Sequence, residues 1–252
     1  MIDLHCHILP GLDDGADSWD TAVEMGRMAA EAGTEIAAAT CHFNHPSAAF
    51  APGSEAFWQQ YREKKSRLEQ RFREEGIPLA LADGVEVFAG GNLFSLLKDQ
   101  SLPTLNGTRY LLVETALDAP AFFIYRVLDR LLERDYIPVL AHPERYRCVQ
   151  NVHAHVYEWY QMGALIQINK GSLLGAFGSA ARRTADAILR HRLAAVAASD
   201  AHSCFHRTPK MDEFGRILAK NYGAACPTLL LEENPRRILD GRKVLWESPI
   251  PF

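Results

Sequence analysis

The sequence has no long apolar run, no secretory leader and no dense cluster of Lys and Arg. Because spanning a membrane takes about 18 consecutive apolar residues, no transmembrane segment is predicted. The N-terminus, MIDLHCH, lacks the basic stretch and apolar run of a signal peptide. The formal net charge of -4 gives no indication of nucleic-acid binding. We therefore expect a cytoplasmic protein without a nucleic-acid partner.

The cysteines are few, scattered and never spaced as CxxC, a pattern typical of reduced thiols rather than a disulfide framework. They are Cys6, Cys41, Cys148, Cys204 and Cys226. A cysteine-dependent tyrosine phosphatase needs an Arg six positions after its nucleophile, so that one loop holds thiolate and phosphate together. The residues at that spacing are Leu12, Ser47, Ala154, Lys210 and Glu232, which excludes that mechanism.

Apolar runs alternate with amphipathic segments along the 252 residues, with no repeat or linker-like break, so we expect one domain over residues 1–252. The predicted strands are Ile2–Cys6, Glu35–Cys41, Leu79–Val87, Tyr110–Thr115, Ile137–Ala141, Leu165–Asn169 and Ala194–Ser199. The predicted helices are Ser18–Ala32, Ser54–Glu75, Ala121–Arg134, Val149–Met162, Gly178–His191 and Lys210–Tyr222.

The strands are mostly continuous in hydrophobicity, which indicates a parallel sheet covered by helices on its faces. Seven strands with helical crossovers favour an α/β fold of the distorted (β/α)7 TIM-like barrel type over an open doubly wound sheet. Periodicity by itself does not distinguish the two. Cys41–Gly53, with Pro46 and Pro52, is predicted to be an irregular loop.

Polar residues stand where these strands end. Because the carboxyl ends of barrel strands meet on one face, we expect these side chains to converge there. They are His5, His7, Asp14, His42, Glu86, Glu114, His142, Asp200 and His202. In an extended chain His5 and His7 project to the same side, and Asp200 and His202 repeat that spacing.

Nine imidazole and carboxylate ligands exceed the needs of one ion, so two or three divalent ions are predicted. The absence of thiolates from the set favours manganese, iron or zinc over calcium. Such ions lower the pKa of bound water to about 7 and hold phosphoryl oxygens, which points to phosphate-ester hydrolysis.

Two arginines follow ligands closely enough to reach the same face. Arg145 comes three residues after His142, and Arg207 five residues after His202. Guanidinium groups bind phosphate oxygens in bidentate fashion, so both are predicted to bind the substrate phosphate.

The loops beside the ligands supply weaker candidates. His45 and His206 are predicted on the rim, and Phe43, Phe50 and Phe205 as an aromatic wall for a phenyl ring. Asp13 and Glu144 are predicted to support the ligands rather than bind metal. Cys6 and Cys41 are expected to be small core residues.

The motifs HxH at His5 and His7, Thr-Cys-His42, His142-Pro-Glu-Arg145 and Asp200-Ala-His202 resemble those of the PHP (polymerase and histidinol phosphatase) family. More narrowly, His-Ile-Leu-Pro-Gly-Leu-Asp13-Asp14-Gly15, Leu102–Asn106 and Glu233–Leu239 resemble bacterial manganese-dependent protein-tyrosine phosphatases of capsule and exopolysaccharide biosynthesis, the CpsB/CapC type. The likeness covers essentially the whole chain. One departure is Phe43-Asn44-His45-Pro46, where relatives often carry basic residues.

The resemblance implies a PHP-type barrel and three divalent ions, Mn²⁺ first, with Fe or Zn as alternatives. His5, His7 and Asp200 would bind one ion, Glu86 would bridge to a second completed by Glu114 and His142, and Asp14, His42 and His202 would bind the third. Arg145 and Arg207 match the family's substrate-phosphate arginines. The implied partner is the phosphotyrosine-rich tail of an autophosphorylated tyrosine kinase that regulates polysaccharide synthesis.

Three functions therefore remain. The first is a metal-dependent phosphotyrosine phosphatase. The second is a small-molecule phosphatase, acting on histidinol phosphate or a nucleotide with the same metal centre. The third is a metal-binding subunit that docks a kinase without turnover, which the complete ligand set disfavours.

Overall fold

The computed structural model describes residues 1–99 and 102–252. Its strands all pair in parallel, in a three-stranded sheet of order β1-β2-β4 and a six-stranded sheet of order β3-β5-β6-β7-β8-β9. The strands are β1 (Ile2–Cys6), β2 (Ile36–Ala39), β3 (His42–Phe43), β4 (Ala80–Asp83), β5 (Glu86–Phe88), β6 (Tyr110–Glu114), β7 (Ile137–Ala141), β8 (Leu165–Asn169) and β9 (Ala194–Ala198).

The two sheets join into one distorted barrel. β2 runs on into β3, and β4 into β5, each after two intervening residues, so each pair crosses from one sheet to the other. The ring closes between β9 and β1, where the Asp200 N–H donates to the His5 carbonyl (2.8 Å) and the His7 N–H to the Ala201 carbonyl (2.9 Å). Counting β2 with β3 and β4 with β5 gives seven β segments in the described chain. The predicted (β/α)7 barrel is confirmed.

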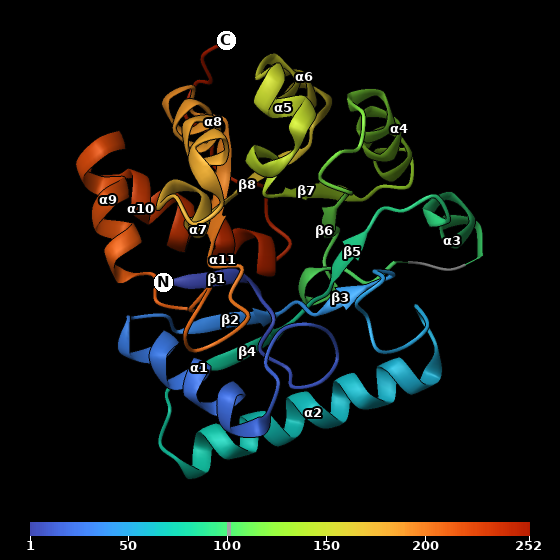
Figure 1. Cartoon of the computed structure of the whole chain (residues 1–252), viewed down its shortest axis with the longest axis vertical. Helices are drawn as coiled ribbons and strands as arrows, with labels where there is room; N and C mark the ends of the chain where they lie inside the picture. The colour runs from blue at the N-terminus through green and yellow to red at the C-terminus, as the bar shows by residue number, and fades with distance from the viewer. Residues whose placement is uncertain (100–101) are drawn as a thin grey trace.

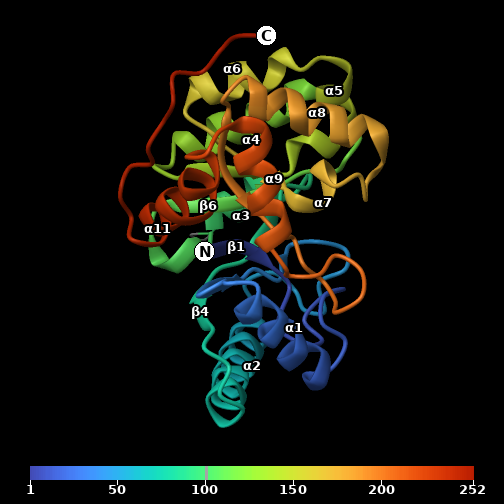
Figure 2. The same ribbon diagram turned by 90° about the vertical axis from the view of Figure 1, so that its left-hand side faces the viewer.

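Helices surround the strands (Figure 1). They are α1 (Trp19–Glu31), α2 (Glu55–Glu74), α3 (Leu93–Asp99), α4 (Ala121–Leu132), α5 (Arg147–Asn151), α6 (Ala154–Met162), α7 (Lys170–Leu173), α8 (Gly178–Arg190), α9 (Asp212–Tyr222), α10 (Cys226–Thr228) and α11 (Asn234–Leu239). Two views show α1 and α2 covering one end of the molecule and α4, α6 and α8 the other (Figures 1 and 2). Within the described residues, no helix is long and apolar enough to cross a membrane.

Local chemistry fixes the first two helices. The Ser18 and Ser54 hydroxyls accept backbone N–H groups in the first turns of α1 and α2, which satisfies donors that the helix itself leaves unpaired. The helices approach closely at Gly26, where a Cβ would lie 2.3 Å from the Phe72 ring. Only glycine leaves room for that ring without a shift of the helices.

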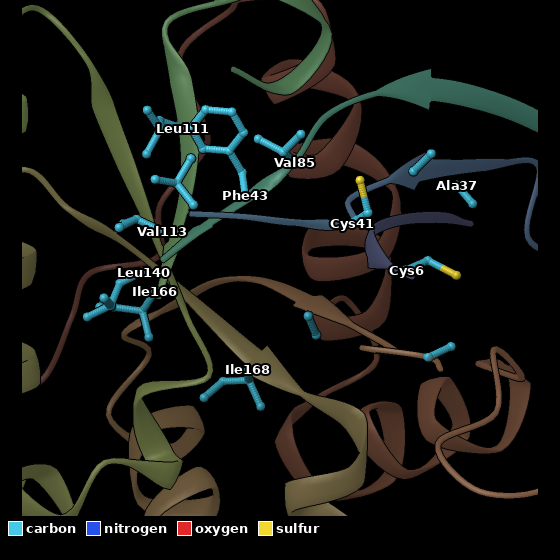
Figure 3. Close-up of a cluster of buried hydrophobic side chains, with 14 of the residues drawn as sticks. Cys6, Ala37, Cys41, Phe43, Val85, Leu111, Val113, Leu140, Ile166 and Ile168 are labelled. Carbon is cyan, nitrogen blue, oxygen red and sulfur yellow. The ribbon is translucent and has the colours of Figure 1, made fainter. Parts of the chain in front are cut away.

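Both faces of the strands are buried, which explains their continuous hydrophobicity. Leu111 and Val113 pack outward into a cluster shared with the helices (Figure 3). Tyr110 and Leu112 belong to a second cluster of alternating strand residues, closed by the α11 residues Ile238 and Leu239, which fills the barrel. On β6 the next residue with the parity of Leu112 is Glu114, so the inward face changes from apolar to polar at the carboxyl end.

The structure corrects three sequence predictions. The strand Leu79–Val87 is interrupted at Gly84 and Val85, where it crosses between the sheets. The loop Cys41–Gly53 begins with β3, because His42 pairs in register with Glu86. The helix Val149–Met162 is two helices, α5 and α6, because Val152 has an extended backbone (φ -140°, ψ 91°).

Candidate metal centre

The barrel brings all nine predicted ligands together at the carboxyl ends of its strands. They form overlapping groups whose ligand atoms lie within 4.8 Å of one another. Eight of the nine are buried, and Asp14, in the loop after β1, is exposed. The groups are His5 with His7 and Asp200; His5 with Glu86 and His142; His7 with Asp14, His42 and His202; and His42 with His45 and Glu114.

The centre of the arrangement is a close pair of ring nitrogens, His5 Nε2 and His7 Nε2, only 3.1 Å apart. His5 Nδ1 donates to Gln167 Oε1 (3.0 Å), and His7 Nδ1 donates to the Asp13 carboxylate (2.7 Å). In its neutral form each ring therefore has its proton on Nδ1 and a lone pair on Nε2. Metal-binding histidines are commonly held in this way by a hydrogen bond at the other ring nitrogen, which leaves both Nε2 atoms available to one ion.

Carboxylates surround the same point. Glu86 Oε2 lies 3.3 Å from His5 Nε2 and 3.4 Å from His7 Nε2, and Asp200 Oδ1 lies 3.5 and 3.7 Å from the same two atoms. The other oxygen of Glu86, Oε1, lies 3.1 Å from His142 Nε2. Glu86 can therefore bridge two positions.

The remaining predicted ligands lie on either side of Glu86. His142 Nε2 is 3.7 Å from Glu114 Oε2. Asp14 Oδ1 is 3.4 Å from His42 Nε2 and 3.7 Å from His202 Nε2. His202 Nδ1 donates to the Asp200 carbonyl (3.1 Å), which leaves its Nε2 lone pair directed at Asp14.

The surroundings of the buried ligand atoms also fit cations. His42 Nδ1 lies 3.1 Å from Glu86 Oε2 and 3.2 Å from Glu114 Oε1, so one imidazole faces two buried carboxylates. A buried carboxylate is costly unless a cation or hydrogen-bond donors compensate its charge. The donor set, imidazole and carboxylate without thiolate, suits manganese, iron or zinc, so the residues fit the predicted metals.

The protein also stabilises the charged carboxylates. Burial alone would raise the pKa of Asp200, but His5 and Arg207 lower it below its usual range. The pKa of Glu86 is likewise held well below its usual value, against burial, by His5, His142 and His42. Both groups are therefore ionised at neutral pH, as metal ligation requires.

The two predicted phosphate arginines flank Asp200. Arg145 follows β7 in a short turn and donates through Nη1 to Asp200 Oδ2 (3.4 Å). Arg207 donates through Nε to the Asp200 carbonyl (3.1 Å), and its Nη2 pairs with Asp200 Oδ1. Both guanidinium groups lie over the ring of Phe177, at 4.3 Å and 5.7 Å from its centroid.

Sequence reasoning missed Phe177, Gln167 and Asn169. Phe177 stands at the start of α8, where no pattern indicated a link to the arginines. Gln167 orients His5, and Asn169 Nδ2 donates to Asp200 Oδ2. The alternation Leu165, Gln167, Asn169 on β8 could have revealed both, because these residues share the inward parity.

The weaker candidate residues differ in where they lie. Phe43 is 1% exposed and packs in the core, so its predicted place in an aromatic wall is wrong. Phe205 is 87% exposed. Cys6 and Cys41 are core residues, as expected, and His45 stacks against His42. Glu144 accepts the Asn169 backbone N–H, which is the supporting role predicted for it.

Comparison with known proteins gives a family match. A family model described as capsular polysaccharide synthesis, CpsB/CapC, matches residues 1–240. The tyrosine-protein phosphatase YwqE of Bacillus subtilis is 33% identical over 251 residues, which are 100% of this chain and 96% of that protein. The tyrosine-protein phosphatase CpsB of Streptococcus pneumoniae is 29% identical over 249 residues, which are 95% of this chain and 98% of that protein.

Solved structures agree. One described with YwqE and CpsB as unique metal-dependent tyrosine phosphatases superposes with a TM-score of 0.89 at 32% identity, covering 100% of this chain and 99% of the other. A lactonase from Listeria monocytogenes has a TM-score of 0.58 at 11% identity, covering 96% and 95%, a likeness of fold alone.

Proposed function

The chain belongs to the CpsB/CapC family of capsular polysaccharide synthesis and is a metal-dependent tyrosine phosphatase, and we propose that it hydrolyses phosphotyrosine with three divalent ions held by its nine converging ligands. The observation that carries the proposal is the close pair of ring nitrogens, His5 Nε2 and His7 Nε2, which lie 3.1 Å apart and are flanked by Glu86 and Asp200.

The ligands divide among three positions. His5, His7 and Asp200 would hold one ion; Glu86, Glu114 and His142 a second, with Glu86 bridging to the first; and Asp14, His42 and His202 a third. Bound there, Mn²⁺ would activate a water as nucleophile and neutralise the phosphoryl oxygens. Iron or zinc would fit the same donors.

The arginines supply the rest of the phosphate site. Arg145 and Arg207 project beside Asp200 from the loops after β7 and β9, with Phe177 behind them. Their N–H groups would bind the non-bridging oxygens of the phosphate, and these bonds strengthen as charge builds on the phosphoryl group. The substrate phosphate would replace Asp200 as the hydrogen-bond partner of those arginine N–H groups that face the opening of the site.

The substrate we propose is the phosphotyrosine-bearing tail of an autophosphorylated bacterial tyrosine kinase that regulates capsule or exopolysaccharide synthesis. The family description, capsular polysaccharide synthesis, supports this choice. We place the enzyme in the cytoplasm, because its five cysteines are free thiols, as in a reducing compartment.

A substrate panel tests the function. The purified protein, loaded with Mn²⁺, is given phosphotyrosyl peptide, phosphoseryl peptide and histidinol phosphate at equal concentrations. We expect the phosphotyrosyl peptide to have the highest kcat/KM. Preference for histidinol phosphate would replace the substrate assignment, and no turnover of any compound would show a docking subunit instead.

A further inference from the structure

His45 lies beside the metal centre but is not among the nine predicted ligands. Its ring stacks on His42, with centroids 4.1 Å apart and planes 16° apart, and meets the Phe88 ring edge-on at 4.9 Å. The side chain is 26% exposed, so it lies at the mouth. Two aromatic neighbours therefore fix the ring plane, while part of the side chain stays exposed.

Hydrogen bonds from Ser47 fix the position of the ring proton. The Ser47 backbone N–H donates to His45 Nδ1 (3.1 Å), and the Ser47 hydroxyl lies 2.7 Å from the same nitrogen. Because a backbone amide can only donate, Nδ1 must be the acceptor, and the ring proton is on Nε2.

This tautomer decides what His45 can do. Its Nε2 lies 3.9 Å from Glu114 Oε1, close enough to belong to a candidate metal group. However, a nitrogen that carries a proton has no lone pair for a metal ion. The N–H also makes no hydrogen bond in the part of the chain that the structure describes. It is therefore an unused donor on the side of the ring that faces Glu114.

We propose that His45 is a substrate-binding residue that donates its Nε2–H to a non-bridging phosphoryl oxygen of phosphotyrosine, a role that rests on the phosphatase function proposed above. It would approach the phosphate from the loop after β3, whereas Arg145 and Arg207 approach from the loops after β7 and β9. The Ser47 Oγ also lies 3.4 Å from Asp14 Oδ1, so the loop that orients His45 lies against the candidate ligands.

Two substitutions distinguish the effect of the Nε2–H donor from the effect of the aromatic ring. His45→Phe keeps an aromatic ring to stack on His42 and removes the donor. His45→Gln removes the ring and keeps an N–H at a similar reach. The measurements are bound metal, KM for a phosphotyrosyl peptide and the inhibition constant of inorganic phosphate, all on the Mn²⁺-loaded protein.

We expect His45→Phe to raise the KM and the inhibition constant of phosphate about tenfold, as for the loss of a hydrogen bond to a charged group. His45→Gln should return both to within about threefold of the parent, and bound metal should be the same in all three proteins. Loss of metal in His45→Phe would make His45 a ligand and overturn the proposal. Unchanged constants in His45→Phe, or constants in His45→Gln as high as those in His45→Phe, would mean that His45 only packs against its neighbours.

This test does not depend on the identity of the best substrate. If the parent prefers another phosphate ester, the proposed substrate fails, yet the inhibition constant of phosphate measured against that ester still tests His45.

Discussion

Asp13 Oδ2 accepts the Nδ1–H of His7 at 2.7 Å, and the same oxygen accepts the backbone N–H of His42 at 2.7 Å. One carboxylate thus joins the ends of two neighbouring barrel segments and sets the tautomer of a central ligand. Although burial opposes it, the His7 charge and these hydrogen bonds lower the pKa of Asp13 to about 2. The loop turns tightly there, since a Cβ on Gly15 would lie 2.3 Å from the His7 carbonyl oxygen.

We expect Asp13→Asn to weaken metal binding by about 10–100-fold while the protein stays folded. The negative charge of Asp13 holds the proton of His7 on Nδ1, and an uncharged amide would no longer enforce this tautomer. Mn²⁺ titration followed by calorimetry measures the affinity, and circular dichroism checks the fold. Asp17→Asn is the matched control, since Asp17 is an exposed carboxylate that accepts the Thr21 hydroxyl. Equal affinities in both variants would remove Asp13 from the metal site.

His142→Ala should abolish turnover and lower the amount of bound metal. His142 Nε2 lies 3.1 Å from Glu86 Oε1, so its loss would leave the proposed second metal position short of a ligand. Elemental analysis after dialysis and a phosphotyrosyl-peptide assay give the two readouts. His155→Ala, on α6, is expected to match the parent. Full activity in His142→Ala would contradict the ligand assignment.

Arg145→Ala should lower kcat/KM by about 10–100-fold and keep the bound metal, since a charge-assisted hydrogen bond contributes about 1.5–3 kcal/mol. The neighbouring exposed Arg147 provides a control of the same charge, and Arg147→Ala should retain kcat/KM. Steady-state kinetics and elemental analysis of the two variants decide the point. Metal loss in Arg145→Ala would mean that this residue maintains the centre rather than the substrate.

Phe177 carries a separate prediction, because its ring lies under both arginines. Cation–π contacts contribute about 0.5–2 kcal/mol, so Phe177→Leu should raise KM and the inhibition constant of phosphate roughly 2–30-fold, with little change in bound metal. Phe177→Tyr keeps the π face and should behave like the parent. If Leu and Tyr give the same KM as Phe, the ring does not position the arginines.

Metal affinity should rise with pH. Burial favours neutral His5, but Glu86 and Asp200 outweigh it and raise the pKa of His5 in the metal-free protein to about 9. At neutral pH His5 thus holds a proton that a metal ion must displace, and each displaced proton makes affinity rise about tenfold per pH unit below that pKa. Anaerobic Mn²⁺ titrations at pH 7 and 8.5, in buffers of different ionisation enthalpy, measure both effects. Affinity independent of pH, without proton release, would contradict the shift.

Much of the fold could be predicted because strand hydrophobicity and helix capping are local. β1, β7 and β8 have the predicted bounds, and Ser18 and Ser54 cap helices at the predicted starts. The crossings from β2 to β3 and from β4 to β5 could not be predicted, since they depend on which sheet each half of a segment joins. The misplacement of Phe43 has a similar cause, because its burial depends on α2 packing over β3.

By itself the sequence determined which residues meet. The carboxyl ends of parallel barrel strands share one face, so a polar residue at each strand end is enough to predict a common site. Only the tertiary structure decided what each meeting side chain does. The proton of His5 is placed by Gln167, 162 residues away, and that of His45 by Ser47, two residues away in a turn that no pattern revealed. The hydrogen-bond partner of one ring nitrogen determines whether the other nitrogen can bind metal or donate a hydrogen bond. Tertiary packing determines which atom that partner is.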